Sequence, residues 1–265
     1  MKLYFGNAVT TATTLMILAL LGYIGVSVWN RGNIACWGRR TLLLLVFGLG
    51  VCCFAAARDG LDKTMQHTID GSGAIAVPIV TFGNRAFDNS LIELRNILEA
   101  HGFHTIAAAA FACEHSFSTT LGAGRPDADD LAEAATFAHA VTGKLAALAA
   151  LDTLPAPIAV DGDAEAGYYQ PRDRHGVFID IRKVKPLTSD ACDQCGLCAA
   201  ACPMGAIDPS DVTKVPGICI KCGACIKKCP QSAKYYDDTG YLYHKEELEA
   251  MYGVRRAANS FYLSF

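Results

Sequence analysis

The stretch that decides the organisation of this chain is CDQCGLCAAACP at residues 192–203, together with CIKCGACIKKCP at residues 219–230. In both segments the cysteines are separated by two, two and three residues, and a proline follows the fourth. Eight of the twelve cysteines therefore fall within 38 residues. Three closely spaced cysteines bring three thiolates to one side of a tight loop, and the fourth points away. Gly196 and Gly223 permit the positive φ that such a loop needs, and the prolines redirect the chain.

This spacing is that of bacterial two-cluster ferredoxins, in which the fourth cysteine of each run binds the other cluster. It predicts two [4Fe-4S] clusters with crossed ligand sets. The ligands of the first would be Cys192, Cys195, Cys198 and Cys229, and those of the second Cys219, Cys222, Cys225 and Cys202. Zinc sites use two pairs of ligands with a longer gap between the pairs. Disulfide frameworks belong to short secreted chains in oxidising compartments. Neither pattern fits these two runs.

The chain has 265 residues, of which 52% are hydrophobic and 18% are charged. This length suits two small domains. The net charge of -3, with no basic stripe, gives no case for nucleic-acid binding.

Apolar residues are concentrated in the N-terminal segment, residues 1–70. Residues 8–29 carry no charge, and a second uncharged run covers residues 41–57. A helical span needs roughly 20 apolar residues, with about 17 as the lower limit, so both runs are candidate membrane spans. The arginines between them favour a cytoplasmic loop, and a two-span hairpin would then place the clusters outside. The conflict disappears if only one of the two runs spans the membrane, or if the segment is buried in protein. It also disappears if this stretch is not the natural reading of the gene.

Residues 71–151 alternate between strand and helix patterns. Residues 74–82 and 103–111 are apolar runs typical of buried strands, although Pro78 counts against a central strand. Helical patterns follow at 89–100 and 127–151. The order strand, helix, strand, helix predicts an α/β fold with a parallel sheet. Residues 152–186, with four prolines, have the composition of a linker.

Ligands of parallel sheets bind beyond the carboxyl ends of the strands. Two polar segments follow the predicted strands, at residues 81–89 and 114–118. Each is either an ordinary loop or part of a binding site, and a hydrogen-bonded pair is the simpler reading of Glu114 and His115. Cys113 is interpreted as a small buried residue. No nucleophile with a base and an orienting group is recognisable, so no residue is assigned a catalytic role.

Residues 71–232, about 60% of the chain, resemble the fusion proteins of a flavodoxin-like and a ferredoxin domain known as EFR-type ferrodoxins. The matching stretches are VTFGNRAFDNSLIELRNILEAHGF, AAAAFACEHSFS, GRPDADDLAEA and the eight-cysteine block. The resemblance implies a five-stranded flavodoxin-like domain followed by two [4Fe-4S] clusters. It also implies electron transfer, with FMN as a further cofactor. The FMN-binding candidates are Thr81, Gly83, Asn84 and Arg85.

The sequence departs from this family in its first half. Residues 6–14, GNAVTTATT, carry hydroxyls but lack the glycine spacing that aims backbone N–H groups at a phosphate. The first 60 to 70 residues are about as long as the half-domain that they replace. A frameshifted reading of the gene and a genuine membrane anchor are both hypotheses for this pattern, and sequencing the locus would separate them.

Together these patterns predict an α/β flavodoxin-like parallel sheet with a divergent, apolar first half. An α+β bacterial 2[4Fe-4S] ferredoxin domain follows at residues 187–232, and a tail with a helix near 244–252 occupies residues 233–265. Tyrosines of the tail are expected to pack over the clusters. Lys221, Lys227 and Lys228 form either a solvated face or a docking patch.

Three functions follow from these patterns. The favoured one is an electron carrier that exchanges single electrons with a redox partner protein. The alternatives are an FMN-dependent reductase and a membrane-anchored ferredoxin subunit of a redox complex. We expect the ferredoxin domain to lie in the cytoplasm. In the alternative, the N-terminal segment associates it with a membrane.

Overall fold

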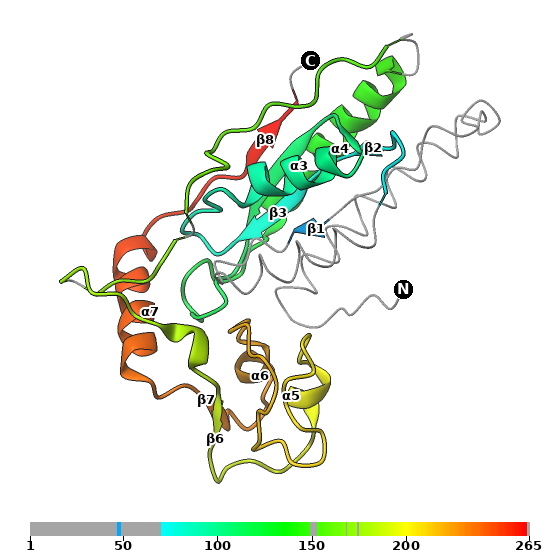
Figure 1. Cartoon of the computed structure of the whole chain (residues 1–265). Coiled ribbons are helices and arrows are strands. Elements are labelled where there is room, and N and C mark those ends of the chain that lie inside the picture. The colour runs from blue at the N-terminus through cyan, green and yellow to red at the C-terminus, as the bar shows by residue number, and fades with distance from the viewer. Residues whose placement is uncertain (1–46, 49–69, 149–152, 168, 174, 264–265) are drawn as a thin grey trace.

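The computed structural model describes residues 47–48, 70–148, 153–167, 169–173 and 175–263. They form a sheet with helices on both faces and a smaller part that carries the two cysteine runs (Figure 1). The main sheet has the strand order β1-β3-β5-β8. Its strands are β1 (Phe47–Gly48), β3 (Ile79–Phe82), β5 (Ala108–Ala112) and β8 (Ser260–Tyr262). β1, β3 and β5 are parallel, whereas β8 is antiparallel to β5. The sheet is therefore mixed, and the predicted parallel arrangement holds for its first three strands.

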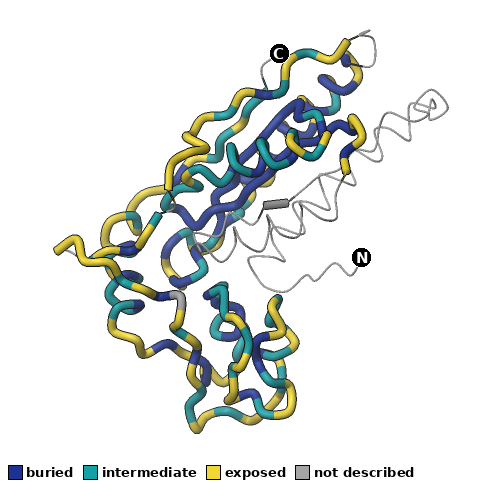
Figure 2. Tube along the Cα trace, in the orientation of Figure 1, coloured by how far each residue is buried: buried dark blue, intermediate teal, exposed yellow. Residues whose placement is uncertain are grey.

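Helices α3 (Ser90–Ala100) and α4 (Ala128–Leu148) cover opposite faces of this sheet. Alternate residues of β5 face each helix: Ala109 and Phe111 pack with α4, while Ala108 and Ala110 pack with α3. Every residue of β3 and β5 is buried. Figure 2 shows this buried layer as the continuous dark core of the upper part.

Pro78 interrupts the first predicted strand. The apolar run at 74–82 forms β2 (Ile75–Ala76) and then β3, and the run at 103–111 likewise forms β4 (His104–Thr105) and then β5. β2 pairs with β4 in a separate two-stranded parallel sheet. Pro78 has no N–H to donate, but its carbonyl accepts a hydrogen bond from the Ala109 N–H at 3.1 Å. The strand and helix patterns predicted for this region are thus confirmed, with each strand divided into two.

The C-terminal tail returns to the sheet, which the sequence pattern did not predict. Helix α7 (Thr239–Tyr252) starts at Asp238, whose carboxylate accepts a hydrogen bond from the Tyr241 N–H at 2.8 Å. It is longer than the predicted helix at 244–252. After α7, residues 253–259 lead back to the sheet edge, where β8 pairs with β5. Residues between α4 and α7 are therefore inserted into the sheet-bearing part of the chain (Figure 1).

The smaller part contains short elements only. They are the 3-10 helix η2 (Ile181–Lys183), strands β6 (Leu187–Thr188) and β7 (Lys234–Tyr235), and helices α5 (Leu197–Ala200) and α6 (Ala224–Lys227). β6 and β7 pair antiparallel and close the segment that holds both cysteine runs. The predicted linker, residues 152–186, packs on the sheet through buried Ile158, whose carbonyl accepts from Arg95 Nε at 3.1 Å.

The predicted membrane spans at 8–29 and 41–57 lie outside the described residues, apart from Phe47–Gly48, which form β1. The hypotheses on residues 1–70 stay predictions for the same reason. Within the part of the chain that the structure describes, no helix has the length and apolarity to cross a membrane.

Candidate metal centre

The two cysteine runs adopt the same backbone conformation, 27 residues apart. Gln194 and Lys221 have φ values of 61° and 57°, and Gly196 and Gly223 have φ values of 75° and 71°. A one-turn helix follows each glycine, α5 in the first run and α6 in the second. A left-handed residue followed by a left-handed glycine bends the chain twice within three residues. The same bend therefore lies among the first three cysteines of each run.

The fourth cysteine of each run accepts a backbone hydrogen bond at its sulfur. The Ala206 N–H donates to Cys202 Sγ, and the Ala233 N–H donates to Cys229 Sγ, both at 3.2 Å. These two alanines also occupy equivalent positions in the runs. The sulfurs of the two fourth cysteines therefore have matching backbone contacts.

Cys198 and Cys225, the third cysteines, are buried in one apolar cluster with Ile207 and Val212. Burial raises the pKa of the Cys198 thiol, and burial together with the neighbouring Cys222 and Cys219 thiols raises that of Cys225 to about 12. Thiolates are unfavourable in such surroundings unless metal ions compensate their charge. The donor set therefore fits a metal centre that binds several thiolates at once.

The arrangement differs from that of a single-ion site. Among the residues that the structure describes, no three His, Cys, Asp or Glu side chains gather as ligands of one metal ion. Zinc holds each sulfur at about 2.3 Å from one central atom, so its ligands must converge closely. The choice of an iron–sulfur cluster over zinc rests on the cysteine spacing, which is that of two-cluster ferredoxins.

The four FMN-binding candidates lie at the carboxyl end of β3, and three of them make internal contacts. Thr81 is buried in the strand. Gly83 packs on the ring of His115, because a Cβ at this position would lie 2.5 Å from His115 Cδ2. The buried Asn84 side chain donates to the carbonyls of two residues and accepts from the N–H of a third; these are Tyr252, Arg255 and Ala257. Asn84 thus fastens the returning tail to the sheet.

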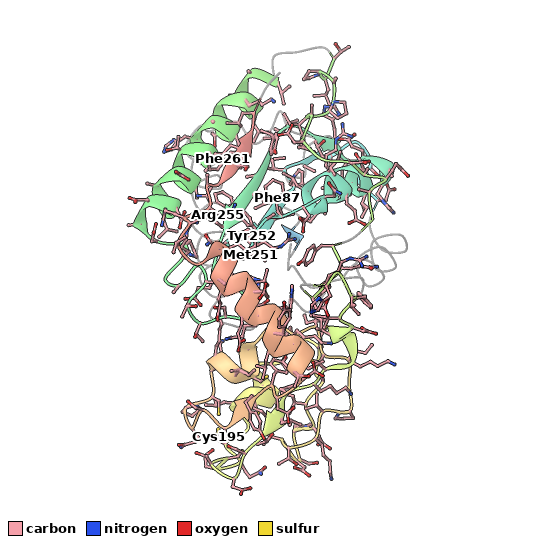
Figure 3. The ribbon with its side chains drawn as sticks, turned by 90° about the vertical axis from the view of Figure 1, so that its left-hand side faces the viewer. Phe87, Cys195, Met251, Tyr252, Arg255 and Phe261 are labelled. Carbon is pink, nitrogen blue, oxygen red and sulfur yellow. The ribbon has the colours of Figure 1, made fainter. Side chains whose placement is uncertain are left out.

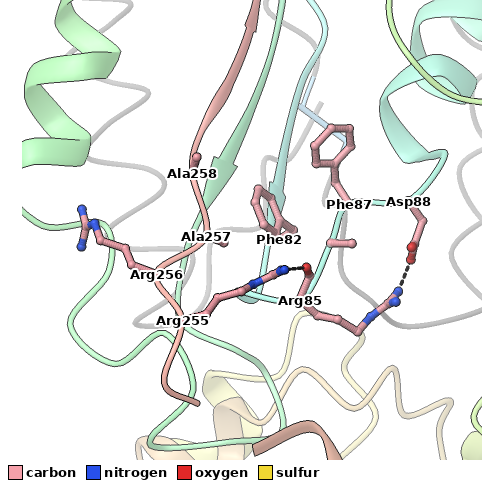
Figure 4. A pocket seen from close by; sticks show the side chains of 9 residues that line it. Phe82, Arg85, Phe87, Asp88, Arg255, Arg256, Ala257 and Ala258 are labelled. Atoms are coloured by element: carbon pink, nitrogen blue, oxygen red, sulfur yellow. Dashed lines mark hydrogen bonds and ion pairs between the residues drawn. The ribbon is translucent and has the colours of Figure 1, made fainter. Parts of the chain in front are cut away.

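Arg85, the fourth candidate, lines a cavity of about 450 Å³ between the loop after β3 and the returning tail (Figure 4). The walls are Phe82, residues 85–88 and residues 255–258. Arg85 forms an ion pair with Asp88, and its guanidinium lies 4.0 Å from the Tyr169 ring centroid. The cavity falls within the size range of small-molecule sites and has both aromatic and cationic walls.

The loop after β5 buries His115. Its Nδ1 accepts from the Phe117 N–H at 3.1 Å, which leaves the proton on Nε2. Nε2 has no hydrogen-bond partner within the described residues. Burial first, then the charge of Lys227, lowers the pKa of His115 to about 3, so the imidazole is neutral. Cys113 is buried, as predicted. His115 therefore serves as a neutral packing residue of this loop.

The same loop contacts the second cysteine run. A Cβ on Gly223 would lie 2.2 Å from the Ser116 carbonyl oxygen, so only glycine fits there. Lys227 Nζ lies 3.2 Å from Glu114 Oε2 and donates to the His115 carbonyl at 2.8 Å. We call these contacts the junction. They bring the carboxyl edge of the sheet next to the second predicted centre.

An aromatic series also connects the junction to that centre. The Tyr236 hydroxyl lies 3.6 Å from Cys219 Sγ. The rings of Tyr236 and Tyr241 are 4.2 Å apart, and those of Tyr241 and Phe117 are 5.0 Å apart. The first run lies farther from the sheet, with Cys195 at the opposite end of the molecule (Figure 3). Sequence reasoning missed the junction, since Glu114 and Lys227 are 113 residues apart and the cysteine spacing does not specify either side chain.

The comparison with protein families matches residues 191–234 to the 4Fe-4S dicluster domain. The curated proteins and the solved structures yield no match. The match covers both cysteine runs and the strand β7 that closes them. This segment is therefore a ferredoxin-type 4Fe-4S domain, and it supports an iron–sulfur electron-transfer role for the chain.

Proposed function

We propose that the chain is an electron carrier with two [4Fe-4S] clusters that exchanges single electrons with a redox partner protein. The first cluster takes Cys192, Cys195, Cys198 and Cys229 as ligands, and the second takes Cys219, Cys222, Cys225 and Cys202. The observation that carries this proposal is the repetition of one loop conformation in both runs. The spacing in each copy provides three cysteines for one cluster and a fourth for the other.

The surroundings of the sulfurs support this assignment. Equal N–H···S bonds at Cys202 and Cys229 indicate that the two fourth cysteines have the same role. The crossing of the ligand sets is taken from the cysteine spacing. Cys198 and Cys225 share one apolar cluster, so the two centres are neighbours. Two clusters that lie close together, with apolar side chains between them, suit the transfer of an electron from one cluster to the other. No proton-transferring residue is needed for this function.

Crossed ligation is tested by two matched variants, Cys202→Ala and Cys229→Ala. In the reduced protein, NMR detects the shifted β-proton signals of each cysteine that binds a cluster. We expect Cys202→Ala to disturb the signals of Cys219, Cys222 and Cys225 and to spare those of the first three cysteines. Cys229→Ala should give the reverse result. Uncrossed ligation predicts the opposite assignment in both variants.

The second candidate is a flavin-dependent reductase within a flavodoxin-like and ferredoxin fusion. The cavity at the carboxyl end of β3 favours it, because Phe82, Phe87 and Arg85 offer aromatic and cationic contacts to a flavin. The junction would then lead from this edge of the sheet toward the second cluster. Flavin released from anaerobically purified protein measures this directly. One FMN per chain supports the reductase, and less than one FMN per ten chains supports the simple carrier.

The third candidate, a membrane-anchored ferredoxin subunit, depends on residues 8–29 and 41–57. We place the ferredoxin domain in the cytoplasm, where cysteines stay reduced and available for clusters. Fractionation of cells that produce the full chain tests both points. Recovery only in the detergent-extracted fraction supports the anchored form, and recovery in the buffer fraction supports the free carrier.

A further inference from the structure

The repeat of one loop conformation allows the surroundings of the two centres to be compared position by position. Residues 27 apart are equivalent, and their side chains differ in charge. The second run has lysines where the first has uncharged residues; the pairs are Lys221 and Gln194, Lys227 and Ala200, Lys228 and Ala201, and Lys234 and Ile207. The first run has Asp193 where the second has Ile220. The charge difference therefore favours an added electron at the second centre.

Burial decides which of these lysines matter most. Lys221 is 5% exposed, and its Nζ donates to the carbonyl of Cys219 at 2.8 Å. Lys234 is 2% exposed, and its Nζ donates to the carbonyl of Val212, which packs with both Cys198 and Cys225, so it does not distinguish the centres. Lys227 is paired with Glu114. Lys221 is thus the buried cation that belongs to the second centre alone.

Tyr236 adds a hydrogen bond to the same cysteine. Its hydroxyl lies 3.6 Å from Cys219 Sγ, and the residue is 8% exposed. A phenol hydroxyl is protonated at neutral pH and can donate to a thiolate sulfur. The equivalent position in the first run is Pro209, which has no donor. In the first run, the Asp193 carboxylate accepts a hydrogen bond from the Cys195 N–H at 3.1 Å. A backbone donor close to the first centre is therefore already used.

We propose that the two clusters have unequal potentials and that the first electron resides on the cluster bound by Cys219, Cys222 and Cys225. This inference rests on the proposed function. Hydrogen bonds to sulfur, net charge and solvent exposure set the potential of a cluster. The hydrogen bonds and the charges favour the second cluster. The exposure of Cys195 acts in the opposite direction, because water stabilises the negative charge that reduction adds. Each cluster accepts one electron from an external one-electron donor. The electron then rests beside the junction, while the exposed Cys195 places the first cluster toward solvent.

The size of the expected shift in potential follows from the charge or the hydrogen bond that each substitution removes. A unit charge about 10 Å away, at an effective dielectric constant of about 20, changes an equilibrium constant roughly tenfold. Tenfold corresponds to 59 mV for a one-electron couple. Loss of one hydrogen bond from a neutral hydroxyl changes the constant by about fivefold. Tyr236→Phe and Lys221→Met should therefore each lower the potential of the second cluster measurably.

The test is an anaerobic redox titration of the full chain with dithionite and mediators, followed by EPR. We expect two steps in the unaltered protein, separated by at least a roughly tenfold difference in the reduction constant. Tyr236→Phe should move only the step at higher potential, toward lower potential. Gln194→Lys, at the position equivalent to Lys221, should move only the step at lower potential, upward. If Tyr236→Phe does not retain both clusters, Lys221→Met takes its place.

Two results would overturn the inference. One is a single step that accounts for both electrons, and the other is a Tyr236→Phe shift confined to the step at lower potential. Iron is counted on each sample before the titration. If the sample holds about eight irons per chain and gives one of these results, only the proposal of unequal potentials is wrong. About four irons or fewer defeats the proposed function itself.

Discussion

Asn84 supplies the sharpest test of how the returning tail is held. Its side chain donates to the Tyr252 and Arg255 carbonyls at 3.0 and 2.8 Å and accepts from the Ala257 N–H at 3.0 Å. Leaving a buried polar group without its partner costs about 1–3 kcal/mol. Three such groups, partly relieved by water entering the adjacent cavity, amount to about 3 kcal/mol. The φ of Asn84 is 61°, so a change to alanine adds about 1 kcal/mol of backbone strain.

The assay is hydrogen–deuterium exchange of the peptide that contains residues 253–263, read by mass spectrometry. A loss of about 4 kcal/mol in the free energy of local opening accelerates exchange about a thousandfold, since each 1.4 kcal/mol is a factor of ten. Asn84→Gly removes the bonds without the strain and should give an effect about fivefold smaller. Peptides from α4 are the internal control and should change little. Acceleration of the 253–263 peptide by less than about tenfold in Asn84→Ala would refute the assigned role.

Three further predictions concern the charged groups around the same tail and loop. Arg125→Leu removes the closer of the two arginines that pair with the buried Asp130 carboxylate, and Arg256 remains at 3.4 Å. The loss should cost about 3 kcal/mol and speed thermal unfolding followed by circular dichroism; unchanged unfolding would contradict it. Lys227→Met removes the part-buried pair with Glu114 and should destabilise the junction by about 1 kcal/mol, seen as faster limited proteolysis between the two parts; Lys214→Met, at an exposed pair, is the control. The pKa of His115 is about 3 in the folded chain and 6.5 when unfolded, so the unfolded chain binds more protons between these values. Its stabilising contribution is complete above pH 6.5 and is lost as the pH falls toward 3, with a slope of up to about 1.4 kcal/mol per pH unit. His115→Gln should flatten the pH dependence of the free energy of unfolding in this window, measured by denaturant titration, and an unchanged slope would count against it.

Local chemistry explains the parts of the structure that the sequence predicts well. The cysteine spacing, with a glycine after the second cysteine and a proline after the fourth, leaves few loop conformations, and the matched φ values of Gly196 and Gly223 reflect this. The spacing of the leucines of α3 and the alternation of β5 residues between the two faces of the sheet follow from periodicity. These signals act over a few residues, so one sequence is enough to read them.

The parts that the sequence does not predict depend on contacts between distant residues. β8 has only three residues, and none of them is buried, so it shows no periodic pattern. Its place beside β5 is secured by Asn259, which accepts from the Ala112 N–H at 2.8 Å, and by the Phe261 ring, 5.5 Å from that of Phe111. The junction likewise depends on residues more than 100 positions apart. Such pairs carry no local signature.

The central claim is that the ferredoxin-type domain binds two four-iron clusters. Iron and acid-labile sulfide, counted on one sample of the full chain purified without oxygen, test it most directly. The proposed ligand sets predict about eight irons and about eight sulfides per chain. About four of each would mean that only one of the two loops binds a cluster, and bound zinc without sulfide would contradict the assignment altogether.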